Sequence, residues 1–193
     1  MKSLLLAASF LCLCGPQAIA QYHIIVNDGG TNCVTAKGES GYRAFAWSVG
    51  ARENLASPNA GISSGKPSFQ DLSVAGFVDA CNSPLLQRNF LGGTLFRTVT
   101  LSQYQNTSGN LLEVVTLTNA ILSSYSIDGS TDSDFASENV SFTYQKICFK
   151  DFTYSPTGTQ ASTQACYDIA TAKETPLILH RSSKIVSSAP VSQ

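Results

Sequence analysis

Residues 139–169 read NVSFTYQKICFKDFTYSPTGTQASTQACYDI and contain two strand-like runs, residues 139–154 and 161–169, on either side of a turn signal. That signal is Ser155-Pro156-Thr157-Gly158, in which proline and glycine favour a reversal of the chain. Cys148 and Cys166 lie at equal distances in sequence from Thr157, so an antiparallel hairpin centred there would place them opposite each other. The segment therefore predicts a hairpin closed by a disulfide between Cys148 and Cys166.

The remaining cysteines predict a second disulfide. The chain contains 6 cysteines, two of which lie in the N-terminal leader described next. If Cys148 pairs with Cys166, Cys33 remains to pair with Cys81. A metal site is the alternative, but the spacings are long, no CxxC occurs and the chain has only 2 histidines. We expect two disulfides, which are typical of an oxidising compartment.

The N-terminus has the pattern of a cleaved secretory signal. Lys2 provides a positive charge, and the apolar run at residues 3–13 is too short to span a bilayer. Gly15 and Pro16 end that run. Cleavage after this run would remove Cys12 and Cys14 together with the signal peptide.

The cleavage site is expected between Ala20 and Gln21. Ala18 and Ala20 place small residues at the two positions that a signal peptidase reads. A lipoprotein anchored at Cys14 is the alternative, but Leu13 is bulky where a small residue is expected. The mature chain is therefore predicted to be secreted or periplasmic, without a stable membrane anchor.

Alternating patterns predict about seven strands. They lie at residues 22–26, 42–49, 68–78, 94–104, 111–125, 139–154 and 161–169. The run at 42–49 has apolar groups on both sides, which predicts burial on both faces. The run at 111–125 is expected to bend near Asn119 and Ala120, and residues 50–67 are predicted to be a long loop.

One short helix is predicted after the third strand. Ser83 is a favourable N-cap, Pro84 suits the first helical position, and Gly92 and Gly93 end the helix. Its apolar face is expected to pack on the core, and it contains Leu85, Leu86, Asn89 and Phe90. We predict one all-β domain at residues 21–174, a barrel or a sandwich, followed by a partly disordered C-terminal tail at 175–193.

The sequence excludes several kinds of chemistry. Its net charge of −1 and the absence of a basic patch argue against nucleic-acid binding. There is no Gly-rich phosphate loop and no Gly-x-Ser-x-Gly elbow, and His23 and His180 are better explained as strand or surface residues than as general bases. An acidic stretch does not match EF-hand spacing, and its members are Asp128, Asp132, Asp134 and Glu138. We predict no catalytic, cofactor or metal site, and no enzymatic activity.

Five segments together resemble a known family. In chain order they are Lys37-Gly38-Glu39-Ser40, Ala44-Phe45-Ala46-Trp47-Ser48-Val49-Gly50, Gly65-Lys66-Pro67-Ser68-Phe69-Gln70-Asp71-Leu72-Ser73, Asn82-Ser83-Pro84-Leu85-Leu86 and Ser137-Glu138-Asn139-Val140-Ser141-Phe142. Over residues 22–170 the chain resembles the haemolysin-coregulated proteins (Hcp), the tube subunits of bacterial type VI secretion. Each segment alone is weak, but their order and spacing agree with the strand pattern.

The resemblance implies a small β-barrel with one flanking helix. It also implies hexameric rings that stack into a tube, which can carry small effectors, and it implies no catalytic residues. Residues 50–67 correspond to the family's extended loop, which contacts a neighbouring ring or subunit. The expected partners are therefore further copies of this chain, secretion-system components and effector cargo.

The leader and the four remaining cysteines distinguish this chain from tube subunits, which are normally made without a signal peptide. We therefore predict an Hcp-like structural protein that is exported in its own right. The alternative is a secreted or periplasmic binding module that keeps the barrel and acts as a monomer.

Overall fold

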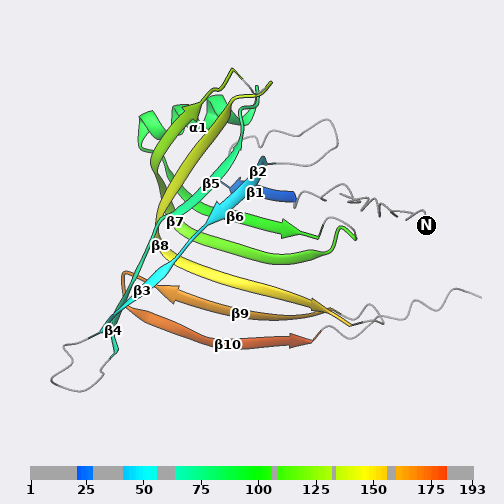
Figure 1. The fold of residues 1–193 in the computed structure, drawn as a ribbon. Coiled ribbons are helices and arrows are strands. Elements are labelled where there is room, and N and C mark those ends of the chain that lie inside the picture. Colours follow the sequence, from blue (N-terminus) through cyan, green and yellow to red (C-terminus); the bar gives the residue numbers. More distant parts are fainter. Residues whose placement is uncertain are drawn as a thin grey trace, which may run out of the picture.

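In the part of the chain that the structure describes, strands make up most of the fold, and one helix lies between the fifth and sixth of them (Figure 1). The computed structural model describes residues 21–27, 41–55, 64–105, 108–131, 134–155 and 160–181. The strands are β1 (Gln21–Asn27), β2 (Tyr42–Ser48), β3 (Ala51–Leu55), β4 (Ser64–Phe69), β5 (Leu72–Phe77), β6 (Leu95–Tyr104), β7 (Leu111–Asp128), β8 (Ser137–Tyr154), β9 (Gln160–Asp168) and β10 (Lys173–Arg181). The helix is α1 (Asn82–Gly92). The predicted all-β fold with one short helix is confirmed.

Strand pairings form a circuit around the core. β8 pairs with β5, β5 with β2, β2 with β1, β1 with β6, β6 with β7, and β7 again with β8, all antiparallel. The circuit makes a small barrel. The β2–β5 wall lies opposite the β6–β7 wall, because β1 separates them on one side and β8 on the other.

The sheet extends beyond the barrel through β8. The first part of β8, residues 137–142, pairs with β5, whereas residues 146–154 pair with β9, which in turn pairs with β10. β3 and β4 form a separate ribbon that projects from the barrel (Figure 1).

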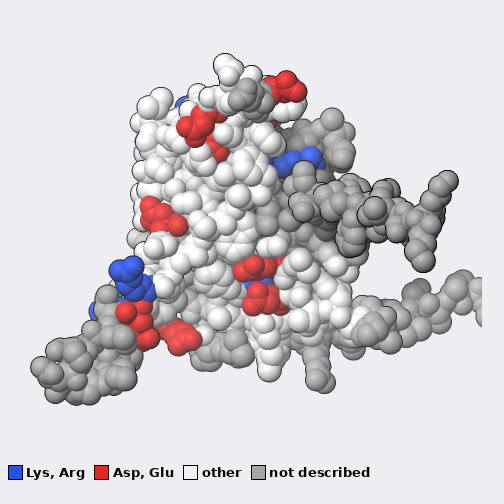
Figure 2. All heavy atoms as spheres, in the orientation of Figure 1, with Lys and Arg blue, Asp and Glu red and all other residues white. Residues whose placement is uncertain are grey.

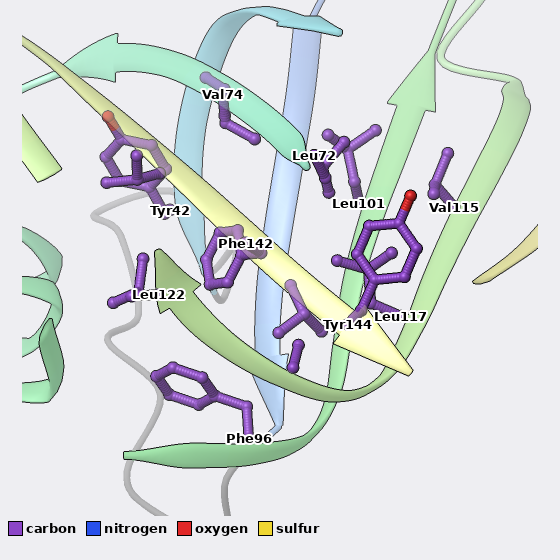
Figure 3. Close-up of a cluster of buried hydrophobic side chains, with 14 of the residues drawn as sticks. Tyr42, Leu72, Val74, Phe96, Leu101, Val115, Leu117, Leu122, Phe142 and Tyr144 are labelled. Atoms are coloured by element: carbon purple, nitrogen blue, oxygen red, sulfur yellow. The ribbon is translucent and has the colours of Figure 1, made fainter. Parts of the chain in front are cut away.

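Inward-facing side chains of the barrel strands make the core (Figure 3). Alternation is clear on β5, where Leu72 and Val74 are buried, and the ring centroids of Phe96 and Phe142 lie 6.1 Å apart. Figure 3 also labels Leu101, Val115 and Leu117, which are fully buried. Each such side chain contributes roughly 1.5–3 kcal/mol when buried.

The predicted last hairpin is confirmed. β8 and β9 pair with Cys148 opposite Cys166, as the position of the turn signal predicts. The predicted bend in the long strand is also confirmed. Asn119 has a φ of 51°, a left-handed conformation that asparagine adopts more readily than most residues, and the β6–β7 pairing skips it.

The predicted long loop at residues 50–67 is wrong in its described parts, which form β3 and the first part of β4. Ala51 pairs with Phe69 and Arg52 with Ser68. Arg52 and Glu53 are exposed, so the ribbon lacks the apolar alternation that identifies a strand. The predicted strand at 68–78 is divided, because the chain turns between β4 and β5, where Gln70 N donates to Gly50 O at 2.8 Å.

The predicted boundary between the domain and its tail, at residue 174, is wrong, because β10 continues the sheet as far as Arg181. Pro176 interrupts the pattern, and the register shifts between Thr175 and Ile178. Proline lacks an N–H, and an edge strand with a bulge tolerates it. Residues 182–193 lie outside the described ranges.

Burial of β2 on both faces is also a wrong prediction. Tyr42 and Ala44 are buried, whereas Arg43, Phe45 and Ala46 are exposed. The pairing with β5 shifts between Ala44 and Ala46, which ends the simple alternation. β2 therefore has one core face and one outer face.

Candidate functional site

A fully buried carboxylate joins α1 to the barrel. Glu138 of β8 accepts hydrogen bonds from Ser83 Oγ at 2.7 Å and from the Tyr125 hydroxyl of β7 at 2.6 Å. Gln87, one turn further along α1, donates to the Tyr125 oxygen at 3.0 Å. A carboxylate can be buried where such donors replace water. These bonds position the helix against the β7–β8 hairpin.

The start of α1 differs from the prediction. The N-cap residue is Cys81, and Asp79 Oδ1 accepts the backbone N–H of Cys81 at 2.8 Å and that of Asn82. Ser83 lies inside the helix, where its hydroxyl bonds to Glu138 and accepts the N–H of Asp79 at 2.9 Å. A carboxylate near a helix N-terminus is favourable. The predicted end is confirmed, since Gly93 has a left-handed φ of 59°.

Tyr42 lies against the backbone of Gly76, the residue that pairs with Glu138 across β5 and β8. A Cβ at Gly76 would overlap the Tyr42 hydroxyl and lie 2.7 Å from the carbonyl oxygen of Arg43. Burial, and then the charge of Glu138, raise the pKa of Tyr42. The Tyr42 phenol is therefore neutral at physiological pH. The close approach of its hydroxyl to the Gly76 backbone leaves no room for a side chain at residue 76.

The described members of the acidic stretch do not come together in one site. Glu138 is buried among its hydrogen-bond donors, whereas Asp128 and Asp134 are exposed, and Asp128 Oδ2 accepts a hydrogen bond from Asn139 Nδ2 at 2.8 Å. Asp132 lies outside the described residues. Within the described ranges, no group of three or more His, Cys, Asp or Glu residues is arranged to hold a metal ion.

The two histidines lie on strands that do not pair. His23 is in β1, which is one of the barrel strands, and His180 is in β10, which is the edge strand of the sheet.

One predicted disulfide lies within the described chain. Cys148 and Cys166 are bonded, with their Cα atoms 4.0 Å apart. Cys81 is also disulfide-bonded, and its partner lies outside the described residues. Cys33 lies outside them too, so its pairing with Cys81 stays a prediction.

The predicted signal peptide, residues 1–20, lies outside the described ranges. β1 begins at Gln21, the residue after the predicted cleavage at Ala20. In the part of the chain that the structure describes, no helix is long and apolar enough to cross a membrane.

An aromatic cluster lies on the outside of the β2–β5 wall. Phe77 is 50% exposed, and its ring centroid lies 4.9 Å from that of Phe45 and 5.8 Å from that of Phe135. Val78 N donates to Ala136 O at 3.0 Å and so holds the two segments together. We define the aromatic face as Phe45, Phe77, Asp134 and Phe135.

Exposed apolar residues also occur on the β6–β7 wall and on α1. Leu91, near the end of α1, is 84% exposed. Leu95 of β6 is opposite Ile121 of β7, and both point outward because their neighbours Phe96 and Ala120 are buried. We define the leucine face as Arg88, Leu91, Leu95, Arg97 and Ile121.

Neither face was predicted from the sequence, because the residues of each face come from separate segments of the chain. The sequence contained a partial indication that Glu138 is important for the fold. Two of the five quoted segments, Asn82 to Leu86 and Ser137 to Phe142, contain Ser83 and Glu138, which bond to each other.

A family model described as "Type VI secretion system effector, Hcp" matches residues 28–150. No curated protein matches. The solved structures include one of a type six secretion system protein, with 19% identity, a TM-score of 0.71, and coverage of 81% of this chain and 99% of that one. Hcp1 from Salmonella typhimurium has 19% identity and a TM-score of 0.61, covering 80% of this chain and 99% of that one. A type VI secretion system effector from Yersinia pestis has 19% identity and a TM-score of 0.55, covering 76% and 98%. At such identities the structures establish the fold, and the family model establishes the family.

Proposed function

The chain belongs to the Hcp family of type VI secretion proteins, and from this premise we propose that it forms hexameric rings that stack into tubes able to carry effectors. The family match across residues 28–150, on a barrel of the same fold as solved Hcp structures, carries this proposal. Hcp proteins are structural tube proteins that are not known as enzymes. We propose no catalytic residue, cofactor or metal for this chain.

Two features support assembly. A ring needs a head-to-tail contact between two different faces of each subunit. The strand residues of the aromatic face lie on the β2–β5 wall, and those of the leucine face lie on the opposite β6–β7 wall. The β3–β4 ribbon projects from the barrel in the region that corresponds to the family's extended loop, which supports contact between stacked rings.

We also propose that the protein is exported in its own right, to the periplasm or the outside of the cell. Disulfides at Cys148–Cys166 and at Cys81 support folding in an oxidising compartment. The small residues before Gln21 support removal of a leader.

Negative-stain microscopy of the mature protein, residues 21–193, tests assembly. We expect rings with sixfold symmetry and a central channel, purified with their disulfides intact. Particles of single-barrel size only would contradict ring formation and favour the monomeric binding module.

Cell fractionation tests export. The variant Ala20→Arg should block cleavage and keep the unprocessed precursor with the cells, because the peptidase requires a small residue there. The control Ala189→Arg, near the other end of the chain, should be processed like the wild type. Equal processing of all three chains would contradict the proposed leader.

A further inference from the structure

The charged residues that belong to the two exposed faces differ in sign. The aromatic face includes Asp134 and the leucine face includes Arg88 and Arg97, all of them exposed. Arg43, two residues before Phe45, already takes part in another interaction. Figure 2 shows few and scattered charged groups on the face in view, and charged residues make up 13% of the chain. On such a surface a few charges beside apolar groups can decide which surfaces meet.

We propose that these two faces are the two halves of one subunit contact, in which the aromatic face of one copy docks on the leucine face of the next. This inference rests on the proposed ring. It assigns the contact to Phe45, Phe77, Asp134 and Phe135 on one side and to Arg88, Leu91, Leu95, Arg97 and Ile121 on the other.

The position of the faces agrees with a head-to-tail contact. The aromatic face lies on β2, β5 and the segment before β8, and the leucine face on α1, β6 and β7. In the barrel circuit β1 and β8 separate these two walls. A subunit with complementary faces on opposite walls adds further copies in one direction, which closes a ring or continues as a filament. Self-contact of a single face would stop at a dimer.

The chemistry of the faces also suits a protein contact. Aromatic residues and arginine are enriched at the centres of interfaces, where a few of them provide most of the binding free energy. Each face combines exposed apolar side chains with at least one charged residue. Ring pairing already holds Phe45, Phe77 and Phe135 together, so little ordering remains on docking.

Single substitutions test each face by native mass spectrometry of the mature protein. Phe77→Asp and Leu91→Asp should each weaken assembly by about tenfold or more, because each places a carboxylate in an apolar contact. Leu179→Asp is the control, since Leu179 is 73% exposed on β10 and belongs to neither face. It should assemble like the wild type. Circular dichroism and thermal melting should show that all three variants remain folded.

A mixture of the two disrupted variants tests the pairing itself. Each Phe77→Asp subunit keeps an intact leucine face, and each Leu91→Asp subunit keeps an intact aromatic face. An equimolar mixture should therefore form a heterodimer with one intact contact and go no further, whereas each variant alone stays monomeric. Absence of the heterodimer would contradict a contact between these two faces.

Charge reversal tests whether the charged residues of the two faces contribute to the proposed contact. Asp134→Arg alone and the pair Arg88→Glu with Arg97→Glu should each weaken assembly, and the triple variant should restore it. Rings that form normally in every variant would overturn the assigned contact and leave the proposed ring intact. A wild-type protein that forms no rings would overturn both the contact and the proposed function.

Discussion

The buried carboxylate of Glu138 is the residue that most directly connects a sequence motif with the fold. In the sequence Glu138 belongs to an acidic stretch, and nothing near it shows that Ser83 and Tyr125 reach it from α1 and β7. Glu138→Ala should lower the free energy of unfolding by about 3 kcal/mol, since the buried Ser83 hydroxyl and the partly buried Tyr125 hydroxyl lose a charged acceptor. Urea unfolding measures this. The matched control, Glu174→Ala at an exposed site on β10, should change it little, and equal effects of both would contradict the role of Glu138.

Gly76 is required by the close approach of Tyr42 to the β5 backbone. In Gly76→Ala the added methyl group would overlap the Tyr42 hydroxyl, so we expect a loss of about 2 kcal/mol or more in the free energy of unfolding. Gly129→Ala is the matched control, because a Cβ there has no neighbouring atom within 4 Å. Thermal unfolding should separate the two variants clearly, and similar melting temperatures would be evidence against the contact.

Tyr144 should make the protein sensitive to alkali. Burial, and then the charge of Asp71, raise its pKa from 10.0 to about 12, and its hydroxyl donates to Gln70 O at 2.9 Å. Because the folded-state pKa is raised, its contribution to stability is complete below pH 10 and is lost as the pH rises through about 12. The near-ultraviolet absorbance change that Tyr144→Phe removes should have its midpoint near the higher value. A midpoint at the ordinary tyrosine pKa would contradict the burial.

At the scale of elements, the β8–β9 hairpin was predictable because its turn, its two runs and its cysteines are close in sequence. The double variant Cys148→Ala with Cys166→Ala should lower the free energy of unfolding by about 3 kcal/mol, since the bridge spans 18 residues. Urea unfolding of the oxidised wild type provides the comparison. An unchanged midpoint would show that the hairpin does not need the bridge.

Other elements lacked local signals. The exposed residues of the β3–β4 ribbon, such as Arg52 and Glu53, have no apolar period, and β10 contains Pro176. β3 forms a strand because it pairs with β4, and β10 forms a strand because it pairs with β9. The division of the predicted strand at 68–78 depends on Gln70, whose backbone bonds to Gly50 and to the Tyr144 side chain. Such contacts cross between segments and cannot be predicted from any one of them.

For the whole molecule, the strand count and one helix predicted a barrel or a sandwich, and the family resemblance predicted the small barrel. The quoted segments contain residues that join elements, such as Ser73 and Ser141, whose hydroxyl oxygens lie 3.0 Å apart across β5 and β8. The two exposed faces were not predictable, because they form only when opposite walls of the barrel are complete.

Native mass spectrometry of the oxidised mature protein measures whether the chain forms a ring. At tens of micromolar we predict a dominant species with the mass of a hexamer, which dissociates when Phe77 or Leu91 is replaced by aspartate. A monomer at all accessible concentrations, folded and with its disulfides intact, would show that the chain does not form rings.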